Sequence, residues 1–177
     1  MPARPADTPS AERWIVSACL LGRPCRYDGG AKGDPRVTQG VAALRAAGAS
    51  VVAVCPEELG GLGTPRPAAE LRGGAGAAVL DGRARVQRTA DGVDVTAAFV
   101  SGARAALEAA PGVTHAVLKA RSPSCGCGRT WIDGAVRSGD GVFAALLRRR
   151  GVTVQTEEEP LSAERPVAGR GPGVRGP

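Results

Sequence analysis

The chain has 177 residues, of which 43% are hydrophobic and 23% are charged, and it carries a formal net charge of +6. Its five cysteines are too few for a disulfide-stapled secreted scaffold, and no apolar run approaches the roughly 20 residues that cross a membrane, so we expect a cytoplasmic protein with no membrane contact. The positive charge is spread along the chain without interleaved aromatic residues, which argues against a nucleic-acid partner.

Both ends of the chain are predicted to be disordered. Residues 1–12 and the basic tail 160–177 are rich in Pro, Ala, Gly and Arg and have few large apolar side chains with which to pack. A single folded domain is therefore predicted over 13–159, a length that buries enough apolar surface to fold without disulfides or a structural metal.

The interior alternates short apolar runs, typical of buried strands, with segments of helical periodicity. Strands are predicted over 14–18, 51–54, 116–119 and 152–154. Between the first two strands, a helix is predicted to begin at the N-cap Thr38 and to end at Gly48, where glycine adopts the left-handed conformation. Two further helices precede the last two strands, one over about 97–110 with Asp94 and Thr96 as its cap and one that follows Asp140 and ends near Gly151.

This alternation predicts the fold class. Strands that alternate with helices are joined by right-handed crossovers and form a parallel sheet covered on both faces. We therefore expect an α/β protein, a three-layer α/β/α sandwich with a mostly parallel, Rossmann-like sheet. Two turn dipeptides, Asp81-Gly82 and Asp133-Gly134, lie between short β-prone runs and predict small β-hairpins near the active face.

Three cysteines fall where the predicted strands end. Cys19 follows the first strand, Cys55 follows the second, and Cys125 lies six residues beyond the third. The carboxyl ends of parallel strands meet at one edge of the sheet, which is where such folds bind ligands. The sequence therefore predicts a site in which three thiols from distant parts of the chain converge.

These thiols are suited to a metal centre, and two kinds of centre are considered. Zinc would take Cys25 as a fourth ligand, although the closely spaced C-x-x-C pairs of most structural zinc sites are missing. A [4Fe-4S] cluster suits three cysteines better, because its fourth iron then stays open for a substrate atom. The only histidine, His115, precedes the third strand at the opposite end of the sheet, which excludes a Ser-His-Asp or Cys-His hydrolase.

Four segments of the chain are distinctive, and they are SACLLGRPCRYDGG (17–30), CPEELGGLGTPRPAAE (55–70), DVTAAF (94–99) and LKARSPSCG (118–126). Together with a closing GDGVFAALL, they resemble the domain-of-unknown-function 523 family, some of whose members are thiouracil desulfidases. The resemblance covers about residues 14–158, nearly the whole predicted domain.

The resemblance implies an enzyme that removes sulfur from a thiolated nucleobase, or a similar small thiocarbonyl, without net redox chemistry and with release of sulfide. It implies a [4Fe-4S] cluster held by Cys19, Cys55 and Cys125. Glu57 resembles the family's proton-handling carboxylate, and Ser122 resembles its partner hydroxyl. Cys127 departs from the family's more frequent pattern, and we assign it no role.

The charged residues near these motifs are further candidates. Lys119 and Arg121 follow the third strand, where a cation would lower the pKa of a thiolate, offset the charge of a cluster and contact the substrate. Arg66, in the Gly-rich segment GGLGTPR, is a candidate partner of the substrate or of the cluster. Glu57 is predicted to be the general base, although Glu57 or Glu58 would also suit the start of a helical turn.

A second function remains open from the residues alone. The same cysteines suit a non-catalytic metal-binding module, holding zinc or a four-cysteine iron–sulfur cluster, that serves structure or redox sensing. Ser122, which precedes a proline, also suits an ordinary turn. The two functions differ in the number of cysteine ligands, since the metal-binding module would use Cys25 as a fourth.

Overall fold

Four parallel strands form the first sheet, in the order β2-β1-β5-β8. The structure, a computed structural model, describes residues 11–161, and residues 1–10 and 162–177 lie outside the described part. The strands are β1 (Arg13–Ser17), β2 (Ser50–Val54), β5 (His115–Leu118) and β8 (Thr153–Thr156). These are the four predicted strands, and each observed boundary lies within two residues of the predicted one.

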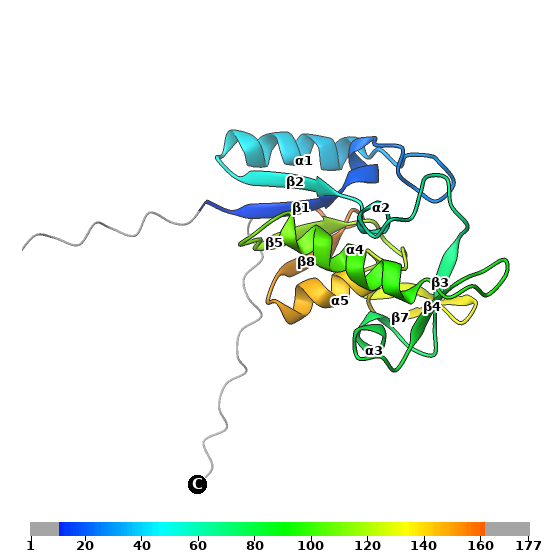
Figure 1. The fold of residues 1–177 in the computed structure, drawn as a ribbon. Helices are drawn as coiled ribbons and strands as arrows, with labels where there is room; N and C mark the ends of the chain where they lie inside the picture. The colour runs from blue at the N-terminus through cyan, green and yellow to red at the C-terminus, as the bar shows by residue number, and fades with distance from the viewer. Residues whose placement is uncertain (1–10, 162–177) are drawn as a thin grey trace, which may run out of the picture.

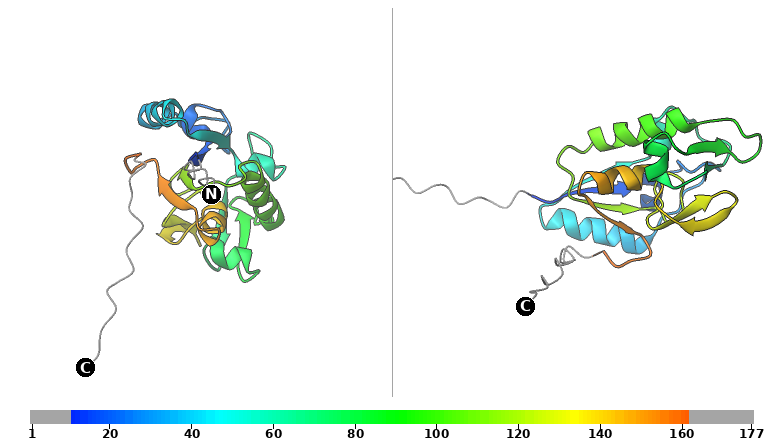
Figure 2. Two further views of the ribbon diagram at one scale, coloured as in Figure 1. Left: turned by 90° about the vertical axis from the view of Figure 1, so that its left-hand side faces the viewer. Right: turned by 90° about the horizontal axis from the view of Figure 1, so that it is seen from below.

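Helices cover both faces of this sheet, as Figures 1 and 2 show. The helices that cover it are α1 (Pro35–Ala46) on one face and α4 (Thr96–Glu108) and α5 (Val142–Arg149) on the other. Successive residues of β1 serve the two faces: Trp14 and Val16 belong to the apolar cluster under α1, whereas Ile15 belongs to the larger cluster that contains Phe99 and Phe143. Because side chains of a strand alternate between faces, one apolar strand fills both cores. The predicted three-layer α/β/α sandwich is confirmed.

The predicted N-cap of α1 is wrong, and at α4 only Asp94 of the two predicted cap residues accepts a backbone amide of the helix. Asp34, not Thr38, caps α1, because its Oδ1 accepts the N–H of Arg36 at 2.9 Å. At α4 the N–H of Thr96 is accepted by Asp94 Oδ1 at 2.8 Å, while the Thr96 hydroxyl accepts the N–H of Val86 at 2.9 Å and so ties α4 to a neighbouring strand. In both cases an aspartate just before the helix takes the orphan amide.

A second sheet, in the order β4-β3-β6-β7, lies beyond the carboxyl ends of the first, on the side toward which β1 and β2 point in Figure 1. Its strands are β3 (Ala69–Arg72), β4 (Arg85–Arg88), β6 (Arg129–Ile132) and β7 (Ala135–Ser138). The sheet is mixed, since β3 pairs parallel with β6 and antiparallel with β4. The two regions in which small β-hairpins are predicted therefore form a complete second sheet next to the carboxyl edge of the first sheet.

Only one of the two expected hairpins is present. Asp133 and Gly134 join β6 to β7, and their φ values of +49° and +79° are those of the two-residue turns that connect twisted antiparallel strands. Asp81-Gly82, in contrast, follows the short helix α3 (Gly76–Leu80), which is inserted between β3 and β4. The prediction of a hairpin turn at Asp81-Gly82 is wrong, because that dipeptide ends a helix.

Two glycines let the short helix α2 (Pro56–Leu59) pack directly on α4. A Cβ atom on Gly102 would lie 1.9 Å from the Pro56 carbonyl oxygen, and one on Gly60 would lie 2.1 Å from the Ala98 carbonyl oxygen. No side chain other than hydrogen fits at either position. This contact fixes the segment that follows β2, which carries two of the candidate site residues.

Residues just outside the predicted domain also make contacts. The carbonyl of Glu12 accepts the N–H of Ser50 at 3.0 Å, and Leu161 packs against the cluster under α1. The carbonyl of Pro160 accepts a hydrogen bond from the Gln155 side chain at 3.0 Å. Residues 1–10 and 162–177 of the two ends for which disorder is predicted lie outside the described part. Within residues 11–161, none of the helices has both the length and the apolar character needed to cross a membrane.

Candidate active site at the carboxyl edge of the parallel sheet

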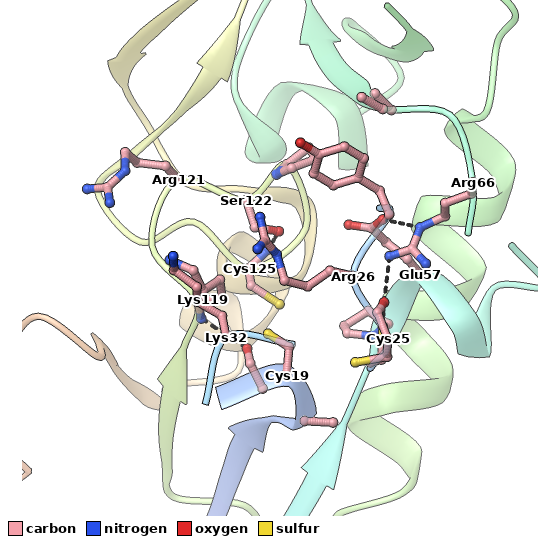
Figure 3. A pocket seen from close by; sticks show the side chains of 18 of the residues that line it. Cys19, Cys25, Arg26, Lys32, Glu57, Arg66, Lys119, Arg121, Ser122 and Cys125 are labelled. Carbon is pink, nitrogen blue, oxygen red and sulfur yellow. Dashed lines mark hydrogen bonds and ion pairs between the residues drawn. The ribbon is translucent and has the colours of Figure 1, made fainter. Parts of the chain in front are cut away.

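A cavity of about 520 Å³ opens at the carboxyl edge of the first sheet (Figure 3). One wall comes from the segments that follow β1, β2 and β5, and the other from residues of the second sheet, among them Ala69 and Trp131. The volume lies in the range of small-molecule sites. Every residue given a site role in the leading sequence-based prediction lines this cavity: Cys19, Cys55, Glu57, Arg66, Lys119, Arg121, Ser122 and Cys125.

The three predicted ligand cysteines converge as expected. Cys19 lies on the 3-10 helix η1 (Ala18–Leu21), Cys55 directly precedes α2, and Cys125 lies in the loop after β5. Cys19 and Cys125 are buried, and Figure 3 shows their sulfur atoms turned toward the same space. The parallel order of the strands brings these three segments together, because each of them begins where a strand ends.

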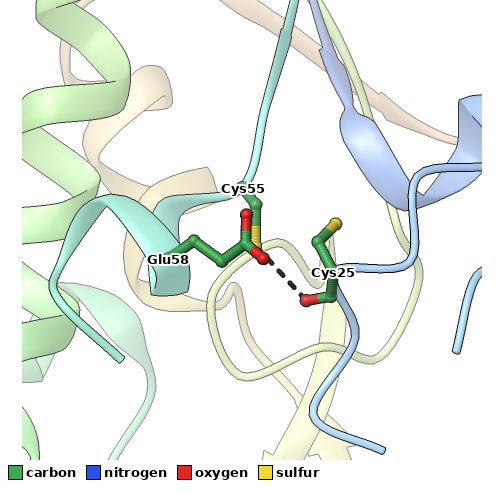
Figure 4. A group of neighbouring side chains, drawn as sticks. All are labelled: Cys25, Cys55 and Glu58. Carbon is green, nitrogen blue, oxygen red and sulfur yellow. Dashed lines mark hydrogen bonds between the residues drawn. The ribbon is translucent and has the colours of Figure 1, made fainter. Parts of the chain in front are cut away.

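A fourth thiol, that of Cys25, lies in the same cavity and is buried. Its Sγ, the Sγ of Cys55 and a carboxylate oxygen of Glu58 all lie within 4.8 Å of one another (Figure 4). The Cys55 thiol also donates to the carbonyl oxygen of Cys25 at 3.6 Å. The cavity therefore offers four sulfur ligands, one more than the assignment from the sequence uses. Cys127 does not line the cavity, and its Sγ accepts a hydrogen bond from Arg148 at 2.8 Å.

The thiols influence one another's protonation. The hydrogen bond to the Cys19 thiol raises the pKa of Cys25 to about 11, and burial raises the pKa of Cys125 to about 12. The hydrogen bond to Cys25 likewise raises the pKa of Cys55. Lys119 and Arg121, which were expected to lower thiolate pKa values, both pair with carboxylates, and their effect on a thiolate stays a prediction.

Glu57 is held by Arg66. The Arg66 Nε donates to Glu57 Oε2 at 2.7 Å, and the two side chains are only 7% and 13% exposed. Arg66 also donates to the carbonyl oxygen of Cys25 at 3.0 Å, so that it joins the carboxylate to the segment carrying the fourth thiol. Glu58 does not line the cavity and binds Arg23 and Thr64. The structure thus separates the two adjacent glutamates that the sequence leaves as alternatives.

The hydroxyl of Ser122 is oriented by its own turn. Ser122 Oγ accepts the N–H of Ser124 at 3.2 Å and the N–H of Cys125 at 3.1 Å. A serine hydroxyl has two acceptor positions and one hydrogen, so its remaining capacity is to donate. Ser122 is therefore both a turn residue that holds Cys125 and a donor at the cavity wall.

A buried carboxylate, Glu157, organises the loop after β5. One of its oxygens accepts the N–H of Ala120 at 2.7 Å, and the other pairs with the Lys119 ammonium. Both side chains are largely buried, at 9% and 15% exposure. Arg121 pairs with Glu158 at the surface. Glu157 was not predicted from the sequence, where its only signal is a run of glutamates that begins three residues after the last predicted strand.

Known proteins resemble this chain over most of its described length. A family model described as 2-thiouracil desulfurase matches residues 15–159. The protein YbbK of Bacillus subtilis, which is described as uncharacterized, is 40% identical over 150 residues, spanning 82% of this chain and 95% of YbbK.

A solved structure described as the [4Fe-4S]-dependent thiouracil desulfidase TudS (DUF523Vcz) is 45% identical. The two structures match with a TM-score of 0.68, and the match covers 83% of this chain and 91% of the TudS chain. The resemblance noted from the sequence is confirmed by these matches. Since the family model spans nearly all of the described residues, the chain belongs to the 2-thiouracil desulfurase family.

Proposed function

We propose that this protein removes sulfur from a small thiolated substrate, a thiouracil or a related thiocarbonyl, and releases it as sulfide. One observation carries the proposal: cysteines from three strand ends, a held carboxylate and a donating hydroxyl line one cavity. This occurs in a chain that is 45% identical to a [4Fe-4S]-dependent thiouracil desulfidase. The sequence-based prediction of a [4Fe-4S]-dependent desulfidase agrees with both the family and that relative.

The donor set of the cavity fits a [4Fe-4S] cluster. Its potential metal ligands are thiols with one carboxylate, Glu57, and thiolates are the ligands that iron–sulfur clusters use. The chain's one histidine, His115, stacks on Trp14 at the start of the parallel strands, away from the thiols. Cys19, Cys55 and Cys125 would hold the cluster, which when bound supplies a thiophilic site that draws electron density from a thiocarbonyl carbon.

The chain's own residues activate the attacking water and transfer the protons. Glu57 accepts a proton from the water molecule whose oxygen replaces sulfur on the carbon, and Arg66 holds the carboxylate in place through its Oε2. Ser122 donates its hydrogen to the departing sulfur and regains one from the proton that Glu57 took from water, so both protons of the sulfide come from that water. In sum, a thiocarbonyl and water become a carbonyl and hydrogen sulfide, and no electrons are gained or lost. Lys119 and Arg121 complete the polar side of the cavity, where they contact the substrate.

Glu157 is expected to stabilise the loop that carries Ser122 and Cys125. Glu157→Gln should lower the free energy of unfolding by about 1–3 kcal/mol. The single amide oxygen can accept only one of the two hydrogen bonds, from the Ala120 N–H or from Lys119, and the uncharged amide forms no ion pair with the Lys119 ammonium. The matched control is Glu158→Gln, whose half-exposed pair with Arg121 should contribute under about 1 kcal/mol. Unfolding in urea measures both, and equal losses in the two variants would contradict this role.

The proposed function is tested by metal content and turnover together. Protein purified without oxygen should contain iron and acid-labile sulfide in equal amounts and should release sulfide from 2-thiouracil or 4-thiouracil. A stable protein with iron but no sulfide release from either compound would contradict the proposal.

The second candidate function, a non-catalytic metal-binding module, is favoured by one observation. Cys25, Cys55 and Glu58 are close enough to hold a metal ion together. Zinc in place of iron, with no turnover, would support this alternative. Two further proposals go with the enzyme: it acts in the cytoplasm, where its five free thiols stay reduced, and it has no nucleic-acid partner.

A further inference from the structure

Two aromatic side chains are exposed, and both line the cavity. Trp14, Phe99 and Phe143 are buried in the cores, whereas Tyr27 and Trp131 are 44% and 45% exposed. These five are all of the aromatic residues other than histidine in the chain. A large apolar ring left in water at the edge of a cavity is a common feature of ligand sites. The exposed aromatic surface of this protein is therefore concentrated at the candidate active site.

The position of Trp131 is set by its strand. In β6 the side chains of Thr130 and Ile132 are buried, whereas those of Arg129 and Trp131 face outward. The Thr130 hydroxyl donates to the carbonyl oxygen of Ser122 at 2.9 Å, which anchors the strand to the loop that forms one wall of the cavity. Trp131 is the next residue, so its backbone is held close to the loop that carries Ser122, and its side chain lines the same cavity.

Of the two exposed rings, that of Tyr27 already has the Arg26 guanidinium over one face, 5.8 Å from the ring centroid, which leaves Trp131 as the ring without such a partner among the described residues. The polar groups of the cavity suit the edge of a substrate. Glu57, Ser122, Lys119 and Arg121 are polar groups that bind atoms at the rim of a planar ring, and the thiols suit its sulfur. A flat base also has two π faces, on which aromatic side chains stack. On the basis of the proposed function, we propose that Trp131 stacks on the pyrimidine ring of the substrate. The second sheet then supplies the binding surface for the base, and the first sheet supplies the chemistry.

Tryptophan emission provides a test that does not depend on turnover. The chain has two tryptophans, and the other, Trp14, is buried against His115. Addition of uracil, which has no sulfur to lose, to the oxygen-free holoenzyme should quench the emission in a saturable manner. Trp131→Phe should lose this response, and Arg129→Ala, which alters the neighbouring outward residue of β6, should keep it. An unresponsive wild type, or an undiminished response in Trp131→Phe, would overturn the proposal.

Kinetics give the second readout. Trp131→Leu should raise the KM for the thiouracil that the enzyme uses by roughly 5- to 150-fold, the range expected for loss of one stacked base, with kcat nearly unchanged. Trp131→Phe should recover most of the affinity, because its ring can still stack. An unchanged KM in Trp131→Leu, or loss of its iron, would also overturn the proposal. If the wild type releases no sulfide, the proposed function fails, while the uracil titration still decides the role of Trp131.

Discussion

Replacing Cys19, Cys55 or Cys125 with serine is expected to abolish binding of the cluster. Three thiolates are the fewest that anchor a four-iron cluster and leave one iron open, so the loss of any one should leave too few ligands. All three line the cavity, and a serine hydroxyl is too weak an acid to replace a thiolate there. Iron and acid-labile sulfide per chain, measured with the visible absorption of oxygen-free protein, check this prediction.

Two other cysteines serve as controls for the ligand variants. Cys127→Ser should keep all of its iron, because Cys127 lies outside the cavity and contacts Arg148. Cys25→Ser should keep much of its iron, although Cys25 contacts the thiols of Cys19 and Cys55. If Cys25→Ser loses the cluster as completely as Cys125→Ser while Cys19→Ser retains it, the ligand set must be assigned again with Cys25 in it.

Glu57→Gln is expected to keep the cluster and to lose turnover by roughly 10²–10⁴-fold, the usual contribution of a general base. The amide oxygen can still accept the hydrogen bond from Arg66, so the side chain should stay in place. The amide cannot accept a proton from water, so the chemical step should slow. Sulfide release from a thiouracil and the iron content of the same sample are the measurements.

Glu58→Gln is the internal control for this prediction. Glu58 is the neighbouring glutamate, but it binds Arg23 and Thr64 and does not line the cavity, so its variant should remain near wild-type activity. Full activity of Glu57→Gln with intact iron would remove Glu57 from the mechanism. Loss of both activity and iron would instead give Glu57 a structural role.

Much of the first sheet and of the thiol site could be predicted from the sequence. The four strands of the first sheet are apolar runs separated by helical periods, and these patterns are local. Once the strands are parallel, their carboxyl ends must lie at one edge, so Cys19 and Cys55 meet there, and the loop that begins at the end of β5 brings Cys125 to the same edge. Local pattern and connectivity are sufficient for this part of the prediction.

The second sheet could not be predicted in the same way. β3 and β4 have only four residues each, with the sequences AELR and RVQR, and they show too few alternating apolar residues to be recognised alone. They become strands by pairing with each other, and β3 also by pairing with β6, which lies far along the chain. Their β structure therefore depends on long-range partners more than on local preference.

The sequence by itself determined the α/β sandwich, the convergence of three thiols and the family to which the chain belongs. Only the tertiary structure decided how the charged groups pair: Arg66 with Glu57, and Lys119 with Glu157. It also decided that Cys25 enters the cavity and that Trp131 faces it. The physical reason is that an ion pair or a cavity wall depends on where loops from distant segments meet, and no periodicity within a segment encodes that meeting.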